Sequence, residues 1–282
     1  MSNRVTIHTL HEMKQRGEAI AMLTAYDYPT AALLDQAGID MILVGDTLGM
    51  VVHGFETTLP VTMDMMVLHC QAVTRGAKRP LIVADMPFMS YQTSVADARR
   101  NAARLLAEGG ADAVKVEGGA FIVPTIKALT EAGIAVMGHI GLTPQSVSVF
   151  GGYKTQGKSL EAARKLIADA RAIEEAGAFA LVIEAIPARL AALISGQVGI
   201  PTIGIGAGAG CDGQVLVTHD MLGLFERFTP RFVKKYADLS TSLREAFAAY
   251  CADVRARDFP AEAHEFTVAD DVWSALEDEF ST

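Results

Sequence analysis

The chain has 282 residues, of which half are hydrophobic and 20% are charged, so a large apolar core is available and extensive disorder is excluded. Its formal net charge of −9 argues against a nucleic-acid partner. Residues 258–282 contain eight acids and no Lys or Arg, and we expect this acidic C-terminal extension to be a solvated arm or an inter-subunit contact.

The three cysteines, Cys70, Cys211 and Cys251, are far apart and show no paired spacing, which is typical of reduced thiols in a cytoplasmic protein. The sequence shows no basic segment followed by an apolar run at its start, and no apolar stretch of about 18 residues or more. We therefore expect neither a signal peptide nor a membrane span.

In chain order, a helical pattern over residues 6–16 comes first and is expected to cap the bottom of the fold. Short apolar runs then alternate with segments of helical periodicity. The runs predict eight strands at residues 19–24, 41–44, 81–84, 113–116, 135–139, 180–183, 202–205 and 215–218. The periodic segments predict helices at residues 30–37, 63–75, 95–108, 124–132, 160–176 and 188–195.

Apolar strands that alternate with helices indicate a parallel α/β sheet covered on both faces. A doubly wound open sheet is one solution. The eight strands, the chain length and the absence of a Gly-x-Gly-x-x-Gly motif after the first strand favour a closed (β/α)8 TIM barrel. No linker or repeat divides the chain, so we predict a single domain over residues 1–282. Residues 230–257 are expected to add a C-terminal extension made of an amphipathic helical pair.

Acidic residues follow or end four of the predicted strands: Asp46, Asp85, Glu117 and Glu184. The C-terminal ends of barrel strands meet at one mouth, where the active sites of such barrels lie. One such acid is as well explained by a helix cap or a turn. Four together repel one another, and they need a cation, a shared proton or a basic partner.

A basic partner is present, because Lys115 precedes Glu117 by two residues and shares its inward face. An all-oxygen donor set is also suited to Mg²⁺, which keeps free positions for a chelating 2-oxo acid. A polarised oxo group acidifies the adjacent C–H for a carboxylate base. This pattern predicts enolate formation followed by the making or breaking of a carbon–carbon bond.

Two further features allow more than one interpretation. His139 ends the fifth strand, where it either polarises a substrate or is a hydrogen-bonded core residue. The Gly-rich segment 203–214 follows the seventh strand, and it would suit a bound phosphate or the close approach of a flat ligand.

Several blocks resemble, in the same order from roughly residue 6 to residue 250, those of the ketopantoate hydroxymethyltransferase family. They are LTAYDYPTA, VGDTLGM, ADMPFMSYQTS, AVKVEGG, GHIGLTPQS, VIEAIPA, IGIGAGAGCDGQVLVTHDMLG and PRFVKKYADL. The resemblance implies a (β/α)8 barrel with one Mg²⁺ per subunit. It also implies hydroxymethyl transfer from 5,10-methylenetetrahydrofolate to 3-methyl-2-oxobutanoate through a Mg²⁺-stabilised enolate. The product would be 2-dehydropantoate (ketopantoate), in the first step of pantothenate biosynthesis.

The resemblance also assigns roles by motif. Asp46 and Asp85 would bind both the metal and the substrate, with Glu117 as a third metal ligand, directly or through water. Lys115 would bind the substrate carboxylate.

Thr47 stands where the family usually has Ser in contact with the substrate, and it keeps the hydroxyl. Glu184 would be the general base, with His139 as a possible accessory. The family implies a homodecamer in which C-terminal segments are exchanged between subunits.

Two other functional classes stay open. One is another Mg²⁺-dependent 2-oxo acid lyase or mutase of the phosphoenolpyruvate/isocitrate lyase type. Such enzymes typically carry a reactive cysteine in a mobile loop, and Cys211 is the one candidate here. The other class is a non-catalytic ligand-binding barrel. The cluster of buried carboxylates argues against it, because such a cluster without a function would only destabilise the fold.

Overall fold

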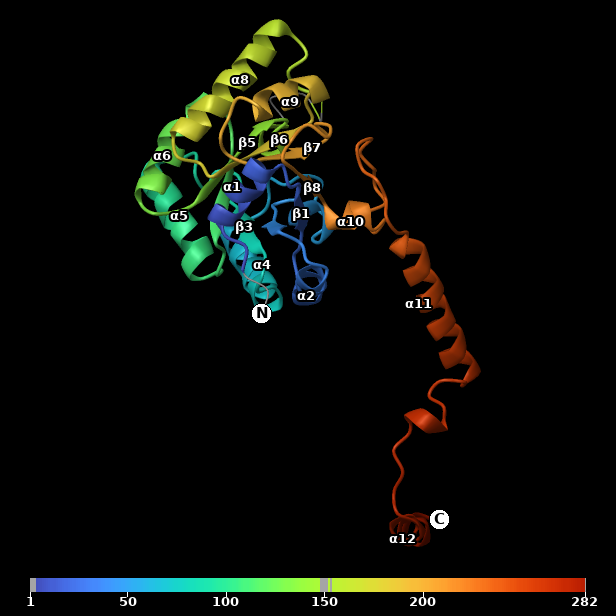
Figure 1. Ribbon diagram of the computed structural model, residues 1–282. Helices are drawn as coiled ribbons and strands as arrows, with labels where there is room; N and C mark the ends of the chain where they lie inside the picture. The colour runs from blue at the N-terminus through green and yellow to red at the C-terminus, as the bar shows by residue number, and fades with distance from the viewer. Residues whose placement is uncertain (1–3, 148–151, 153, 282) are drawn as a thin grey trace.

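Eight parallel strands close into a barrel in which each strand pairs with its neighbours in sequence and β8 pairs with β1 (Figure 1). The computed structural model describes residues 4–147, 152 and 154–281. The closed barrel of eight parallel strands confirms the predicted (β/α)8 fold. The strands are β1 (Ile20–Thr24), β2 (Met41–Val44), β3 (Leu81–Asp85), β4 (Ala113–Glu117), β5 (Val136–Gly141), β6 (Ala180–Glu184), β7 (Thr202–Ile205) and β8 (Gly213–Leu216).

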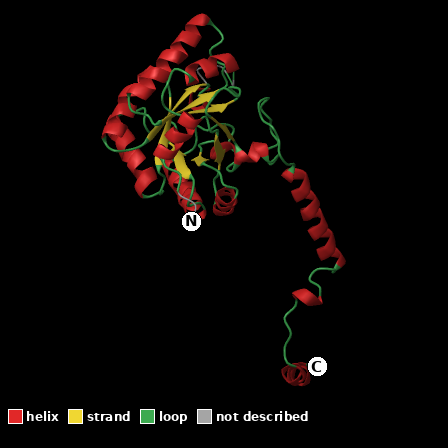
Figure 2. Cartoon of the chain, in the orientation of Figure 1, coloured by secondary structure: helices red, strands yellow, loops and turns green. Residues whose placement is uncertain are grey.

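Helices surround the strands, as Figure 2 shows. Three short 3-10 turns at Ala120–Ile122, Pro144–Ser146 and Glu262–His264 lie in connecting segments. The α-helices are α1 (Ile7–Arg16), α2 (Tyr28–Gln36), α3 (Leu48–Val51), α4 (Met63–Gly76), α5 (Val95–Ala107), α6 (Val123–Glu131), α8 (Leu160–Glu175), α9 (Ala188–Ser195), α10 (Thr218–Met221), α11 (Leu239–Ala256) and α12 (Asp270–Phe280).

Most predicted boundaries differ from the structure by one or two residues, and two predictions fail for a visible structural reason. The eighth strand begins at Gly213, two residues before the predicted start, because the backbone of this glycine packs directly on Ile20 of β1; a Cβ on Gly213 would lie 2.5 Å from the Ile20 carbonyl oxygen. The expected helical pair over residues 230–257 is one helix, α11. The preceding residues 230–238 are not helical, and the amides of Tyr236 and Leu239 bind the carbonyls of Met221 and Leu222 instead.

The N-terminal helix α1 caps the bottom of the barrel, as predicted. Its first turn is capped by Thr6, whose side chain accepts a hydrogen bond from the Thr9 amide at 3.2 Å, and the helix ends at Gly17 in a left-handed conformation. Leu10 is completely buried. It joins the apolar cluster inside the barrel, whose other members include Val5, Met22, Met41, Leu43, Leu81, Val83, Ala113, Met137, Val182 and Val215.

Along the strands, the side chains that point into the barrel change from apolar at the bottom to charged at the C-terminal mouth. On β4 the inward side chains are Ala113 at the bottom, then Lys115 and Glu117. The strand register places Asp85 beside Lys115, and Glu117 beside His139. The ionisable groups therefore gather at the C-terminal mouth, above an apolar interior that α1 closes from below.

The Gly-rich connection between β7 and β8 is shaped by packing. Cβ atoms on Gly208 and Gly210 would lie 2.4 Å and 2.5 Å from the Cβ atoms of Ala188 and Ala192 on α9. Any side chain at either position would push this connection away from the helix. These glycines are therefore explained without a bound phosphate.

The C-terminal arm, comprising α11 and α12, extends away from the barrel (Figure 1). Neither helix buries a residue within the chain. In the described part of the chain, no helix combines the length and the apolar character needed to cross a bilayer.

We expect Leu10→Ala to lower the free energy of unfolding by about 2–5 kcal/mol, because it leaves a cavity beneath the barrel that its neighbours cannot fill. Urea unfolding followed by circular dichroism measures the change. Leu33→Ala, on the exposed face of α2, is the control and should change the value by less than about 0.5 kcal/mol. Equal effects of the two substitutions would contradict the capping role of α1.

Candidate active site

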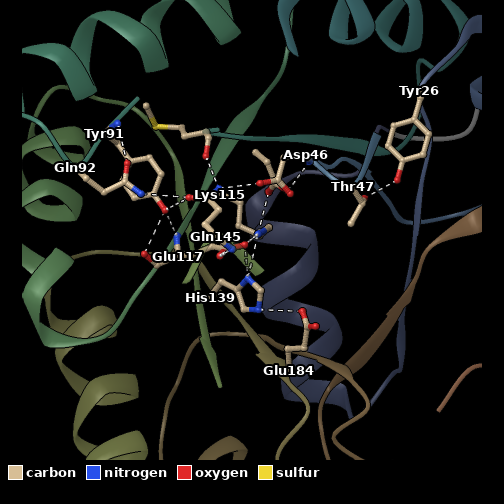
Figure 3. Close-up of polar contacts among 12 residues, drawn as sticks. Tyr26, Asp46, Thr47, Tyr91, Gln92, Lys115, Glu117, His139, Gln145 and Glu184 are labelled. Carbon is tan, nitrogen blue, oxygen red and sulfur yellow. Dashed lines mark hydrogen bonds and ion pairs between the residues drawn. The ribbon is translucent and has the colours of Figure 1, made fainter. Parts of the chain in front are cut away.

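The predicted site residues lie together at the mouth of the barrel (Figure 3). Glu184, the last residue of β6, is partly exposed beside the others, and Thr47 lies in the turn after β2. The remaining five are buried, with relative exposures of 2% for Asp46, 3% for Asp85, 3% for Lys115, 4% for Glu117 and 2% for His139.

Lys115 is the centre of the charged cluster. Its Nζ lies 3.0 Å from Asp85 Oδ1, 3.5 Å from Glu117 Oε1 and 3.1 Å from His139 Nδ1. An ammonium group at this depth is tolerated only because carboxylates surround it. The sequence-based expectation that Lys115 points into the barrel beside Glu117 is confirmed.

His139 connects the cluster to Glu184. Its Nε2 lies 3.2 Å from Glu184 Oε2, and its Nδ1 lies 3.3 Å from Glu117 Oε1. When the ring is neutral, Nδ1 can accept from Lys115 while Nε2–H lies beside Glu184; when it is protonated, both nitrogens carry a hydrogen. The structure thus makes His139 a hydrogen-bonded buried residue that also touches the predicted base.

Asp46 is held by its loop and by Gln145. The Asp46 amide donates to Asp85 Oδ2 at 3.0 Å, which ties the turn after β2 to the end of β3. Gln145 Nε2 donates to Asp46 Oδ2 and to the Met86 carbonyl, both at 2.9 Å, and the Gln145 amide donates to Glu117 Oε2 at 3.1 Å. Gln145 therefore fixes two of the predicted metal ligands at once.

Tyr91 supports the same network. Its hydroxyl donates to Gln145 Oε1 at 2.7 Å and accepts from the Glu117 amide at 3.0 Å. For Tyr91 the sequence predicts only a loop over the site, and it gives no prediction for Gln145. The signal for Gln145 was its position six residues after His139 in GHIGLTPQS, but only the turn at Pro144–Ser146 directs it inward.

Thr47 makes one contact that bears on its predicted role. Its Oγ1 lies 2.7 Å from the Tyr26 hydroxyl. Burial raises the pKa of Tyr26, so its phenol stays protonated and can donate to Thr47. The Thr47 hydroxyl is then free to donate in turn to a ligand in the cavity it lines.

Burial dominates the electrostatics of the two aspartates. It raises the pKa of Asp46 well above the usual range, and the charges of Asp85 and Glu117 raise it further. Burial also raises the pKa of Asp85, against the opposing charge of Lys115. Both carboxyls therefore resist ionisation until a further positive charge arrives.

The other three groups are shifted toward their charged forms. Burial opposes the charge on each, but neighbours outweigh it. Asp85 and Glu117 raise the pKa of Lys115, Lys115 lowers the pKa of Glu117, and Glu117 with Glu184 raises the pKa of His139. Lys115 and Glu117 thus form a stable ion pair within an otherwise acidic site.

The cluster lines a small cavity of about 50 Å³, which adjoins a larger one of about 530 Å³. Thr47 and Glu184 line both cavities. The small cavity suits an ion and a compact ligand, and the larger one leaves room for a second molecule beside it.

Comparison with known proteins identifies the family. The family model for ketopantoate hydroxymethyltransferase matches residues 4–262. The chain belongs to the ketopantoate hydroxymethyltransferase family. The predicted resemblance is confirmed, and the chain is an enzyme of a transferase family.

Two relatives show the extent of the likeness. The 3-methyl-2-oxobutanoate hydroxymethyltransferase of Carboxydothermus hydrogenoformans is 57% identical over 270 residues, which cover 96% of this chain and 98% of that protein. The enzyme of the same name from Enterococcus faecalis is 58% identical over 271 residues, again covering 96% and 98%.

Solved structures of similar fold are much more distant. Phosphonopyruvate hydrolase in complex with oxalate and Mg²⁺ has a TM-score of 0.61 at 14% identity, covering 98% of this chain and 99% of that one. 2,3-Dimethylmalate lyase, a PEP mutase/isocitrate lyase superfamily member, has a TM-score of 0.58 at 17% identity, covering 88% and 87%. These likenesses support the barrel fold alone.

The carboxylate oxygens of the candidate metal ligands do not converge on one point. Among the residues that the structure describes, no three His, Cys, Asp or Glu side chains are arranged so that they could hold a metal ion. Asp85 and Glu117 turn instead toward Lys115, and Asp46 turns toward Gln145. An ion here would have few direct protein ligands.

Cys211 lies away from the site. Its neighbour Asp212 pairs with Lys14 of α1 at 2.8 Å and with the start of β7 through Thr202, near the bottom of the barrel. Burial raises the pKa of the Cys211 thiol to about 11, which keeps it protonated and unreactive. The cysteine expected of the lyase and mutase alternative is therefore not at the mouth.

We expect Lys115→Met to lower the free energy of unfolding by about 3–5 kcal/mol at pH 8, because three buried carboxylates lose their cation. The loss should shrink as the pH falls to 6. Without Lys115 the carboxyl pKa values rise further, so the folded variant binds protons that replace the missing charge. Urea unfolding at both pH values, in the presence of EDTA, measures this.

Lys127→Met is the matched control, since Lys127 pairs with Glu131 at the surface at 3.9 Å. It should cost less than about 0.5 kcal/mol at either pH. A pH-independent loss in Lys115→Met would contradict the electrostatic explanation.

Proposed function

We propose that this enzyme transfers a hydroxymethyl group from 5,10-methylenetetrahydrofolate to 3-methyl-2-oxobutanoate and so forms ketopantoate, in the first step of pantothenate biosynthesis. The names of relatives at 57% and 58% identity support the acceptor and the reaction type. The observation that carries the proposal is the buried cluster around Lys115, which has a partly exposed carboxylate, Glu184, at its edge.

The residues present fit one Mg²⁺ per subunit. Three buried carboxylates face a single lysine, so a divalent cation would balance the remaining charge, and oxygen donors are those that Mg²⁺ prefers. Asp46 and Asp85 would hold the ion, and Glu117 would act directly or through water. When bound, the metal would polarise the 2-oxo group of the substrate. In a protein of similar fold, phosphonopyruvate hydrolase, Mg²⁺ is found with oxalate.

Lys115 and Thr47 would bind the acid end of the substrate. Lys115 offers an ammonium group at the floor of the small cavity, and Thr47 offers a hydroxyl at its wall. Both can donate to a carboxylate, and Lys115 also stabilises negative charge that develops on the neighbouring oxygen. These two donors orient C3 of the oxo acid toward the open side of the cavity.

Glu184 would remove the C3 proton. It is the most exposed of the clustered carboxylates and lines both cavities, so it can reach a substrate carbon that faces the larger one. His139 Nε2, 3.2 Å from Glu184 Oε2, supports its position from behind. The carbanion formed at C3 then attacks the methylene carbon of the folate. The bonds from this carbon to the folate nitrogens break, water supplies the hydroxyl group of the product, and tetrahydrofolate leaves.

The test is deuterium exchange at C3 of 3-methyl-2-oxobutanoate in D₂O without folate, followed by NMR. Glu184→Gln should slow the exchange by at least about a hundredfold, because the amide cannot accept the proton. Glu131→Gln, at the exposed end of α6, is the control and should exchange at the wild-type rate.

Chelation of Mg²⁺ with EDTA should abolish exchange in the wild type, and added Mg²⁺ should restore it. Wild-type exchange in Glu184→Gln would show that another group is the base. Exchange without ketopantoate formation in the presence of 5,10-methylenetetrahydrofolate would refute the transfer reaction.

The enzyme is also proposed to be a homo-oligomer, a decamer in accordance with the family resemblance, in which α11 packs on a second copy. Leu243, Phe247, Tyr250 and Val254 recur every three or four residues along one face of α11, and all four are exposed within the chain. Such an apolar stripe is stable in water only when it is covered. The acidic extension after residue 257 stays a predicted inter-subunit arm.

We expect Phe247→Glu to reduce the oligomer to smaller species in sedimentation velocity, since it buries a charge in the contact. Ala252→Glu places the same charge on the opposite face of α11 and should leave the sedimentation coefficient unchanged. Identical behaviour of both variants would contradict the proposed contact.

A further inference from the structure

The larger cavity beside the catalytic cluster has the features of a second substrate site. Its volume of about 530 Å³ is in the range of small-molecule sites. Thr47, Pro144, Glu184, Ile205 and Val217 form a wall that it shares with the small cavity. A ligand bound here would therefore lie against the carboxylate that faces the oxo acid.

Most of the lining is apolar and much of it aromatic. The side chains come from α3, from the end of β5 and from the segment that follows α10; they are Met50, Val51, Leu142, Phe225, Phe228 and Phe232. Surfaces of this kind bind flat rings by burial and stacking. An elongated molecule with ring systems fits them better than a second small acid does.

Asp220 is an unpaired carboxylate in this lining. It is half-buried, and no described residue donates a hydrogen bond to it or forms an ion pair with it; Lys235 acts on it only from a distance. Burial raises the pKa of Asp220 to about 6. A partly desolvated carboxylate without donors is unfavourable by itself, and a ligand that brings N–H groups would relieve it.

Arg231 supplies the opposite charge at the edge of the same cavity. Its side chain is exposed and forms no ion pair with any residue in the described part of the chain. Its guanidinium is therefore available to a carboxylate outside the apolar part of the cavity. The cavity thus offers a carboxylate, aromatic walls and a cation.

We propose that Asp220 binds the pyrimidine edge of the tetrahydropterin and that Arg231 binds the glutamate end of the folate co-substrate. A 2-amino-4-oxopyrimidine presents the N3–H and an amino N–H side by side, and one carboxylate can accept both. The ring system and the aminobenzoyl group would lie along the phenylalanines. The one-carbon unit is carried on the far side of the ring system and is left free to face Glu184.

This inference rests on the proposed function, because it assumes a folate donor. The test separates the two by measuring folate binding and oxo acid exchange independently. Asp220→Asn should raise the Kd for tetrahydrofolate, and the KM for its methylene form, by about ten- to a hundredfold, as expected for the loss of hydrogen bonds to a charged group. C3 exchange, which involves no folate, reports whether the variant is folded and its oxo acid site intact.

Arg231→Ala tests the other end of the ligand. It should weaken tetrahydrofolate binding about tenfold but leave tetrahydropteroate, which lacks the glutamate, at its wild-type Kd. Asp220→Asn should weaken both ligands equally. Arg100→Ala, on the surface of α5, is the control and should change neither Kd.

The outcomes are distinguishable. Unchanged Kd values in Asp220→Asn and Arg231→Ala, in an enzyme that makes ketopantoate from the folate, overturn the inference and leave the proposed function standing. Loss of C3 exchange together with folate binding in Asp220→Asn also overturns it, since the residue would then serve the oxo acid site or the fold. Failure of the wild type to use the folate, while exchange persists, refutes the transfer reaction itself.

Discussion

The buried ammonium group of Lys115 is the constraint on which the rest of the site depends. It lies within ion-pair distance of Asp85 and Glu117, at a depth where an unpaired charge would be prohibitive. One lysine cannot neutralise three buried carboxylates, and burial raises the pKa values of Asp46 and Asp85, so both resist ionisation until a further cation binds. The same imbalance that makes the empty cluster unfavourable makes it a good receptor for a divalent cation and for a ligand that carries N–H or metal-binding groups.

The barrel explains why this imbalance occurs at one end only. Parallel strands place all their C-terminal ends on one side, and α1 seals the other side with Leu10. The charged cluster lies at the mouth, where Glu184 is the least buried carboxylate. His139 spans the distance between the deep ion pair and this outer acid, so the two parts of the site respond to one another through a single imidazole.

The sequence predicted much of this fold because buried parallel strands are short apolar runs between helical stops, and two of them, Met41–Val44 and Thr202–Ile205, were placed to the residue. It was less reliable where packing competes with the apolar pattern. Gly213 begins β8 because its backbone lies against Ile20, and a residue without a side chain adds nothing to an apolar run. Residues 230–238 show a helical pattern but bind the carbonyls after α10 instead.

The sequence by itself determined which groups face the barrel interior, because a period of two puts Lys115 and Glu117 on one side of β4 wherever the strand lies. Only the tertiary structure decided what those groups touch. Gln145 donates a hydrogen bond to Asp46, which lies 99 residues earlier in the chain. Asp220 and Glu184, which belong to different segments, line the same cavity. Contacts of this kind depend on how the strands and loops pack against one another. A local pattern of residues does not specify the distance between two residues that are far apart in the sequence.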